Sequence, residues 1–460
     1  MKFVDKLSDK LLPVAAKLNN QRHLTSIRDS FIVTMPLIMA ASLFILLNAL
    51  LFSNAAVNKV VDLSRFADLA VLVNNGTLGI LAILVAYNIG ANLSEWYLKN
   101  TSIKEGAFSP IHAGGLSVAL MFIMMPVTSD VPLLSGKVAK ATGVYLQSMT
   151  SSSGLFLAMI SGILGTELFV RLSKFDKLKI KMPDGVPPAV ASTFNSLIPE
   201  MLVIIIVAIP VFAITSMSGK SIPDWVNIII QTPLRGLVLS APGMIVIQFI
   251  SDTLWVFGLH GSSILSPITT APQLQSIQEN MQAFAAHKAI PNIVNAPFLS
   301  SYGLLGGGGC MLPLIIAIFI ISKRSDYRSI AKLAVAPSMF NIAEPIMFGL
   351  PVVMNPIFMI PAAIVPSLNL IIAYFLTSIG FAGKMVAMAP WITPPIIQTW
   401  VSTAGNIPAT ILTVALFVMD TFIYIPFVLA GNKEKIVSST KEEKESVEDT
   451  EDSSTSTNMA

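Results

Sequence analysis

Two short motifs in the second half of the chain place ionisable side chains among apolar residues and helix breakers. Glu344 lies between Asn341 and Pro345 in the stretch NIAEPIMFG, and His260 has glycines close on both sides in WVFGLHGSS. A desolvated carboxylate can accept a proton from a substrate hydroxyl, and a neutral imidazole can contact that hydroxyl or offset developing charge. We therefore predict that Glu344 and His260 bind a substrate and act in its chemistry, and that the amide of Asn341 also contacts the substrate.

Both residues also have a purely structural interpretation. Glu344 could cap the N-terminus of a half-helix, because carboxylate oxygens accept backbone N–H groups there. His260 could be a buried histidine that is satisfied by a neighbouring carbonyl group. The residues themselves leave both alternatives open.

Weaker candidates surround the same region. Trp391 and Trp400 bracket a Pro-rich stretch and could stack on the apolar face of a bound ring, or could be interfacial tryptophans. Asn292 and Asn295 could bond a substrate through their amides, or could cap helix ends. The tetrad Gly306–Gly309 is no nucleotide loop, because the Lys-Ser/Thr pair of a P-loop is missing. No metal-ligand spacing occurs, so we expect neither a metal nor a cofactor.

The composition indicates which elements must position these residues. Of 460 residues, 53% are hydrophobic and 12% are charged, whereas about a quarter are charged in a soluble domain. This argues against a disordered chain, a nucleic-acid binder and an ordinary soluble enzyme. Apolar runs of about 20 residues recur along the chain, and each is long enough to cross a bilayer as a helix. The fold class is therefore an all-α polytopic membrane protein.

Charge distribution predicts the topology. Nine spans are apolar, and their connecting segments divide into a group with 17 Lys and Arg and a group with 7. The first group should face the cytoplasm and includes the N-terminus. Alternation then requires a further crossing within 259–301, which is rich in Gln, Asn and charged residues. A polar crossing is tolerated where it lines a wet cavity. We expect about ten spans, with both termini cytoplasmic.

Two apolar stretches, 335–350 and 384–400, are broken by prolines and polar residues and should form re-entrant hairpins or broken helices. Such elements carry the binding site in many transporters. We predict four parts: a scaffold at 1–217, an amphipathic connector at 218–237, a substrate-binding transport domain at 238–430, and a disordered cytoplasmic tail at 431–460.

Several motifs recur in one order along the chain. They lie at 27–38, 184–190, 194–199, 255–261, 306–309 and 341–345. Together they resemble the membrane-embedded IIC permease of sugar phosphotransferase systems, in the lactose, cellobiose and diacetylchitobiose branch. The aromatic-Gly-x-His-Gly motif of that family matches His260, and its Asn-x-x-Glu-Pro motif matches Glu344.

The resemblance implies a homodimer in the bacterial cell membrane that moves a β-linked disaccharide by an elevator-like displacement of its second domain. It also implies that His260 and Glu344 lie beside the sugar hydroxyl that receives phosphate. Since the longest polar stretch is only the tail from Gly431, we expect the phosphate donor to be a separate phosphorylated IIB protein. The rival interpretation is a proton- or sodium-coupled transporter that releases unmodified sugar, with Glu344 and His260 as a proton relay.

Overall fold

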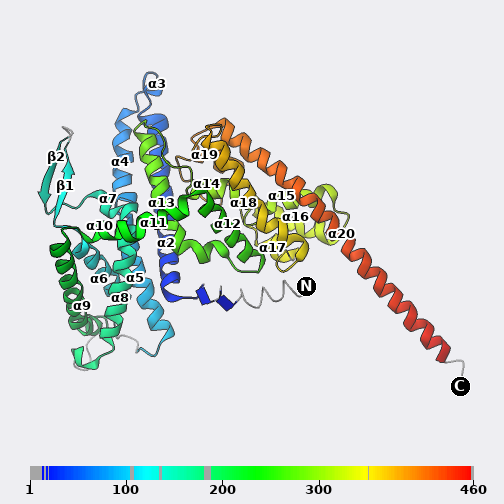
Figure 1. Ribbon diagram of the computed structural model, residues 1–460, viewed down its shortest axis with the longest axis horizontal. Helices are drawn as coiled ribbons and strands as arrows, with labels where there is room; N and C mark the ends of the chain where they lie inside the picture. The colour runs from blue at the N-terminus through cyan, green and yellow to red at the C-terminus, as the bar shows by residue number, and fades with distance from the viewer. Residues whose placement is uncertain are drawn as a thin grey trace.

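A computed structural model describes residues 13–14, 17–18, 20–103, 108–133, 137–180, 188–350 and 352–456. Its helices form two groups that lie side by side, one from the first half of the chain and one from the second (Figure 1). Residues 184–187, which belong to one of the family motifs, lie outside the described part.

The elements follow in chain order. The first group contains α2 (Arg22–Leu47) with the π-helical turn Asn48–Phe52, α3 (Ala55–Asn58), the 3₁₀ turn Ser64–Phe66, α4 (Ala67–Asn75), the 3₁₀ turn Leu78–Ile80, α5 (Leu81–Asn100), α6 (Pro110–Met124), β1 (Thr128–Pro132), β2 (Val138–Thr142), α7 (Gln147–Thr150), the 3₁₀ turn Ser152–Gly154, α8 (Leu155–Ser173), the 3₁₀ turn Asp176–Leu178 and α9 (Pro188–Ser218). The connector contains α10 (Ile222–Val226), the π-helical turn Asn227–Gln231 and α11 (Thr232–Leu239). The second group contains α12 (Ala241–Val256), α13 (Gly261–Ala285), α14 (Ala296–Gly303), α15 (Met311–Ile321), α16 (Ser325–Met339), α17 (Glu344–Gly349), α18 (Pro356–Ser378), α19 (Pro395–Ser402) and α20 (Ile407–Ser456).

Helix α5 forms the centre of the first group, where it packs against α2, α6 and α8. Its residues Leu81, Val85, Ile89 and Leu93 recur every four positions and are at most 1% exposed. This spacing puts them on one face of a helix. Between helices in a bilayer the stabilisation comes mainly from close packing, because lipid tails are as apolar as these side chains.

Within the described residues, six helices are long and apolar enough to cross a membrane, and a seventh arises if the bent pair 222–239 and 241–256 counts as one span. The bend of 77° falls at Ser240, whose hydroxyl accepts the N–H of Gly243 and starts α12. The apolar helices α6 and α15 are shorter, at 15 and 11 residues. The chain is thus a largely helical membrane protein.

The polar stretch in which charge alternation requires a crossing contains α13, a single helix of 25 residues. At 1.5 Å per residue its length is about 38 Å, more than the hydrocarbon core of a bilayer. Gln275, Gln278 and Asn280 are buried along it. It lies against α2 and also contacts the π-helical turn at the end of α2 (Figure 1).

The structure departs from an all-α chain at one hairpin. Strands β1 and β2 pair antiparallel, with Thr128 opposite Thr142 and Pro132 opposite Val138. The prediction of helices alone was wrong for these residues, which include four β-branched side chains and lie in a connection too polar to span.

The tail also differs from expectation. Helix α20 continues to Ser456, into the segment from Gly431 for which composition predicts disorder. Glu and Lys are frequent there and are good helix formers, so an existing helix can propagate into this segment.

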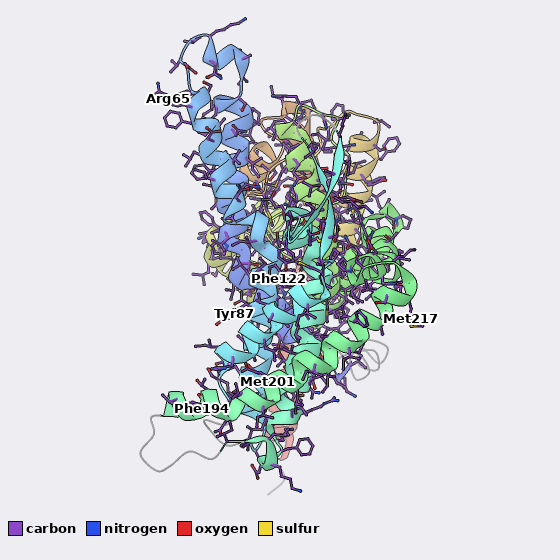
Figure 2. The ribbon with its side chains drawn as sticks, turned by 90° about the vertical axis from the view of Figure 1, so that its left-hand side faces the viewer. Arg65, Tyr87, Phe122, Phe194, Met201 and Met217 are labelled. Atoms are coloured by element: carbon purple, nitrogen blue, oxygen red, sulfur yellow. The ribbon has the colours of Figure 1, made fainter. Side chains whose placement is uncertain are left out.

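One side of the first group is formed by α9, which presents apolar side chains outward. Phe194, Met201 and Met217 are 40%, 55% and 88% exposed and project from α9 in Figure 2. Apolar surface of this extent requires a lipid or a protein neighbour.

Candidate functional site

His260 lies in the turn between α12 and α13 and is the N-cap residue of α13. Its Nδ1 atom accepts the backbone N–H of Ser263 at 3.3 Å. A backbone N–H can only donate, so Nδ1 carries no proton in this arrangement, and a neutral ring has its proton on Nε2. The outer nitrogen of His260 is therefore a hydrogen-bond donor. This capping bond differs from both expectations, which were a ligand alone or a histidine bonded to a carbonyl.

The ring of His260 is held by packing as well. Its centroid lies 4.6 Å from that of Trp255, with 43° between the ring planes. Trp255 is only 7% exposed, so it forms a fixed wall. The imidazole thus has a defined direction before any substrate arrives.

Glu344 is the first residue of α17, after a break that separates this helix from α16. Its side chain is exposed. In the part of the chain that the structure describes, no residue forms a hydrogen bond or an ion pair with the Glu344 carboxylate. The N-cap position belongs to Ala343, which makes no side-chain cap bond. The carboxylate is therefore available to a substrate.

The glycine tetrad Gly306–Gly309 packs against both the His260 motif and the Glu344 motif. Gly307 has φ +98°, and a Cβ there would lie 2.6 Å from the Cβ of Ala343 and 2.8 Å from the carbonyl oxygen of Asn341. A Cβ on Gly308 would lie 2.4 Å from Nε1 of Trp255. The glycine turn is thus packed between Trp255, which holds the His260 ring, and the residues that precede Glu344. Only residues without a side chain fit these contacts.

His260 and Glu344 consequently lie next to the same glycine turn and form one candidate site. The charged groups of Glu344 and, from α2 in the first group of helices, of Arg28 are near enough to influence the His260 ring electrostatically. The sequence pattern did not point to Arg28, although it lies in one of the family motifs. It pairs with Asp29 at 2.9 Å.

Asn341 is fully engaged by backbone groups. Its Nδ2 donates to the carbonyl oxygens of Trp391 and Thr393, at 2.6 and 3.1 Å, and its Oδ1 accepts the N–H of Gly306 at 3.1 Å. The amide therefore holds the Pro-rich loop and the glycine turn against the start of α17. This brings the backbone of Trp391 to the segment that carries Glu344.

The two tryptophans are placed differently. Trp391 is 52% exposed on the loop that Asn341 holds. Trp400 is 45% exposed on α19. A Cβ on Gly405 would lie 3.3 Å from the Trp400 ring, so this ring packs against the turn after α19. Of the pair, only Trp391 is linked to the Glu344 segment by a hydrogen bond.

Asn292 belongs to a polar joint between the connector and α13. Its Nδ2 donates to Oε2 of Glu279 at 2.7 Å and to the carbonyl oxygen of Ser276 at 3.2 Å. Glu279 in turn forms a two-pronged ion pair with Arg235 of α11. No spacing rule links Arg235 and Glu279, which are 44 residues apart, so the sequence alone did not predict this joint.

Asn295 is the N-cap residue of α14, and its Oδ1 accepts the N–H of Phe298 at 3.1 Å. Its side chain is fully buried. Within the described residues its Nδ2 group has no partner. A buried donor without a partner is costly, so this amide is ready to bond a bound molecule or water.

The helical membrane fold, with a histidine and a carboxylate brought together at broken helices, defines a membrane-embedded carrier of small solutes. The family described as Phosphotransferase system, EIIC matches residues 28–366, and the chain belongs to it. It is therefore a sugar permease of the cellobiose and lactose type and a bacterial membrane protein. Such a permease works with a sugar substrate and a IIB partner.

Individual relatives are similar to this chain over almost its whole length. The "Putative permease IIC component YwbA" of Bacillus subtilis is 31% identical over 430 residues, 92% of this chain and 94% of the relative. The "PTS system cellobiose-specific EIIC component" of Geobacillus stearothermophilus is 33% identical over 444 residues, 94% and 95% of the two chains. The crystal structure of the transporter ChbC, the IIC component for N,N'-diacetylchitobiose, has a TM-score of 0.86 and 29% identity, and covers 94% of this chain and 99% of its own.

Proposed function

We propose that this permease binds a β-linked disaccharide and presents its 6-hydroxyl to a separate phosphorylated IIB protein. The observation that supports this most is the single site shared by His260 and Glu344. The relatives named for cellobiose and N,N'-diacetylchitobiose support the choice of a disaccharide.

The two residues have distinct parts in the reaction. Glu344 accepts the proton of the sugar hydroxyl while the hydroxyl oxygen attacks phosphorus. The P–O bond forms, the P–S bond of the IIB phosphocysteine breaks, and the cysteine leaves as a thiolate. His260 donates from Nε2 to an oxygen of the sugar and fixes the acceptor. Phosphoryl transfer depends mainly on such positioning and charge stabilisation.

The remaining residues bind and position the sugar. Trp391 and Trp400 offer aromatic faces to its apolar C–H surface. Asn295 donates its buried Nδ2 to a sugar oxygen. Asn341 and Asn292 contribute indirectly, because their amides hold the loops that surround the sugar.

At the level of the molecule we propose ten spans with both termini in the cytoplasm. The scaffold at 1–217 and the transport domain at 238–430 move past each other like an elevator, guided by the connector at 218–237. Their shared surface includes α2 and α13, which pack together, and the bond from the N–H of Met388 to Oγ of Ser42. The outward apolar face of α9 supports a homodimer.

The test is Glu344→Gln. This change keeps the shape of the side chain and one acceptor but removes the base. Sugar binding should weaken at most moderately, and phosphorylation should fall at least about 100-fold, the lower range for a positioned acid–base group. Binding is measured by titration calorimetry on purified protein, and phosphorylation with phosphorylated IIB and labelled sugar.

The change Glu200→Gln serves as the matched control. Glu200 lies on α9 of the first group, beside His112 at 2.9 Å. Removing its charge should leave both measurements unchanged. Near-wild-type phosphorylation by Glu344→Gln would reduce Glu344 to a structural residue.

A further inference from the structure

A groove along α8, in the first group of helices, combines an apolar wall with a basic end. It encloses about 600 Å³. The apolar lining comes from Phe156, Met159, Ile160, Ile163, Leu164 and Leu168. Across the groove, Ile230 contributes from the connector. The sugar site described above uses none of these residues.

The charged end of the groove holds more positive than negative charge. Glu167 is the carboxylate there, and Arg22, Arg171 and His23 surround it. Oε1 of Glu167 receives bonds from Arg22 at 3.1 Å, His23 at 2.7 Å and the Tyr97 hydroxyl at 2.7 Å. Its other oxygen lies 3.5 Å from Arg171. One carboxylate cannot neutralise both guanidinium groups, so the end of the groove attracts an anion.

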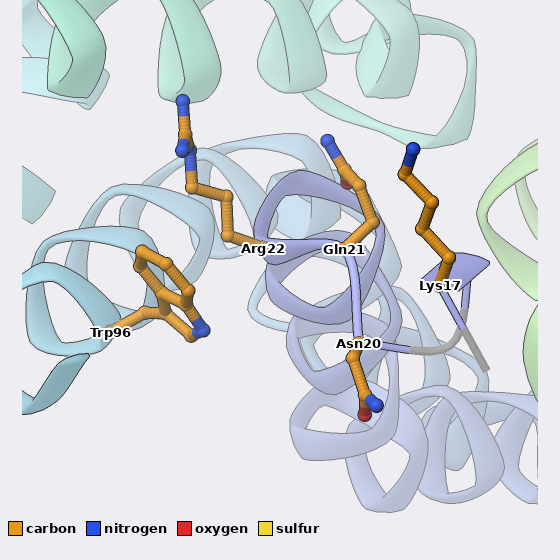
Figure 3. Close-up of a pocket in the computed structure, with 5 residues that line it drawn as sticks. All are labelled: Lys17, Asn20, Gln21, Arg22 and Trp96. Atoms are coloured by element: carbon orange, nitrogen blue, oxygen red, sulfur yellow. The ribbon is translucent and has the colours of Figure 1, made fainter.

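A second cavity of about 450 Å³ adjoins this end through Arg22. Figure 3 shows Lys17 on a short segment before α2, Gln21 and Arg22 at the start of α2, and the ring of Trp96 on α5. Arg22 lies 5.7 Å from the centre of that ring. This cavity therefore adds one more cation, an amide and an interfacial aromatic side chain.

The dimensions match a lipid. From Phe156 to Arg171 the helix rises about 22 Å, compared with about 15 Å for half the hydrocarbon core of a bilayer. The groove can thus hold an acyl chain along α8 and a headgroup at Arg171 and Arg22. The positive-inside rule puts this end at the cytoplasmic leaflet, where anionic lipids attract Lys and Arg.

We propose that the groove is a binding site for an anionic phospholipid, with its phosphate at Arg22 and Arg171 and one acyl chain on α8. The lipid joins the scaffold to the connector, because Ile230 of the connector also lines the groove. A bound lipid therefore steadies the part of the molecule against which the transport domain moves. This inference does not depend on the sugar or on the phosphate donor.

The test uses the purified full-length protein and native mass spectrometry with phosphatidylglycerol and, separately, phosphatidylcholine. Phosphatidylglycerol should bind more tightly. Arg171→Gln should weaken it about fivefold, as expected for one cation near an anionic headgroup. Lys99→Gln is the matched control, because Lys99 and Arg171 are both 70% exposed and both pair with a glutamate four residues before them. It should leave binding unchanged.

A second variant tests the apolar wall. Leu164 is 41% exposed in the groove, so Leu164→Trp fills the groove without removing a buried side chain. This variant should weaken the binding of phosphatidylglycerol and leave the melting temperature of the protein unchanged. Equal binding of both lipids would overturn the proposal. The proposal would also be overturned if inorganic phosphate displaced the lipid and Leu164→Trp had no effect on lipid binding. That result would indicate a simple anion site. Conversion of a dimer to monomers by these variants, with lipid binding intact, would assign the groove to a second copy instead.

Discussion

At the scale of single residues, the two ring nitrogens of His260 have different functions. Nδ1 caps α13, and the proton on Nε2 faces outward. The sequence predicted that His260 matters, but its capping bond depends on how the chain turns between α12 and α13. Asn341 is a similar case, since its amide was expected near the substrate and is committed to three backbone groups.

The two nitrogens can be separated by substitution. Asparagine is a good N-cap, so His260→Asn keeps the cap, but its shorter side chain has no donor at the position of Nε2, whereas His260→Ala removes both groups. We expect both variants to lose sugar affinity by about tenfold, in line with one lost hydrogen bond of about 1.4 kcal/mol. Only His260→Ala should also lose about 1 kcal/mol of stability. Calorimetric titration and denaturant unfolding measure the two effects, and wild-type affinity in His260→Asn would remove His260 from the sugar site.

At the scale of elements, the glycine turn between α14 and α15 decides whether the site exists. The sequence shows four consecutive glycines, but which segments they bring together depends on tertiary contacts. The packing of Gly307 against Ala343 and of Gly308 against Trp255 lies outside any local pattern. In the segment for which charge alternation predicts a crossing that hydropathy does not show, the structure has one helix of 25 residues, α13. The β1–β2 hairpin was missed because its ten strand residues show no regular alternation of apolar and polar side chains.

The turn can be tested with Gly307→Ala. A Cβ at φ +98° is strained by about 1–2 kcal/mol and would meet backbone atoms of the Asn341 segment. We expect lower stability and a loss of both sugar binding and phosphorylation, because Glu344 follows the displaced segment. Gly115→Ala on α6 is the control, since its Cβ would meet nothing within 4 Å. It should be neutral or slightly stabilising. Equal behaviour of the two variants would show that the turn does not position Glu344.

At the scale of the whole molecule, the ten-span count depends on α13. Single cysteines placed at exposed positions in a Cys310→Ala background can be labelled from either side of sealed vesicles. Residues Lys288, at the end of α13, and Lys140, in the hairpin, should both react from outside. Residues Lys177 and Ser325 should react from the cytoplasmic side. If the cysteine at position 288 is labelled from the same side as the cysteine at position 177, α13 does not cross the membrane.

The central claim is that the permease delivers its sugar in phosphorylated form, through the site of His260 and Glu344. The most direct measurement is uptake of labelled cellobiose or diacetylchitobiose into vesicles loaded with phosphorylated IIB protein, with and without an uncoupler. We predict phosphorylated sugar inside, no accumulation without phosphorylated IIB, and no effect of the uncoupler. Free sugar inside, together with loss of uptake when the proton gradient collapses, would contradict the account and favour a proton-coupled carrier.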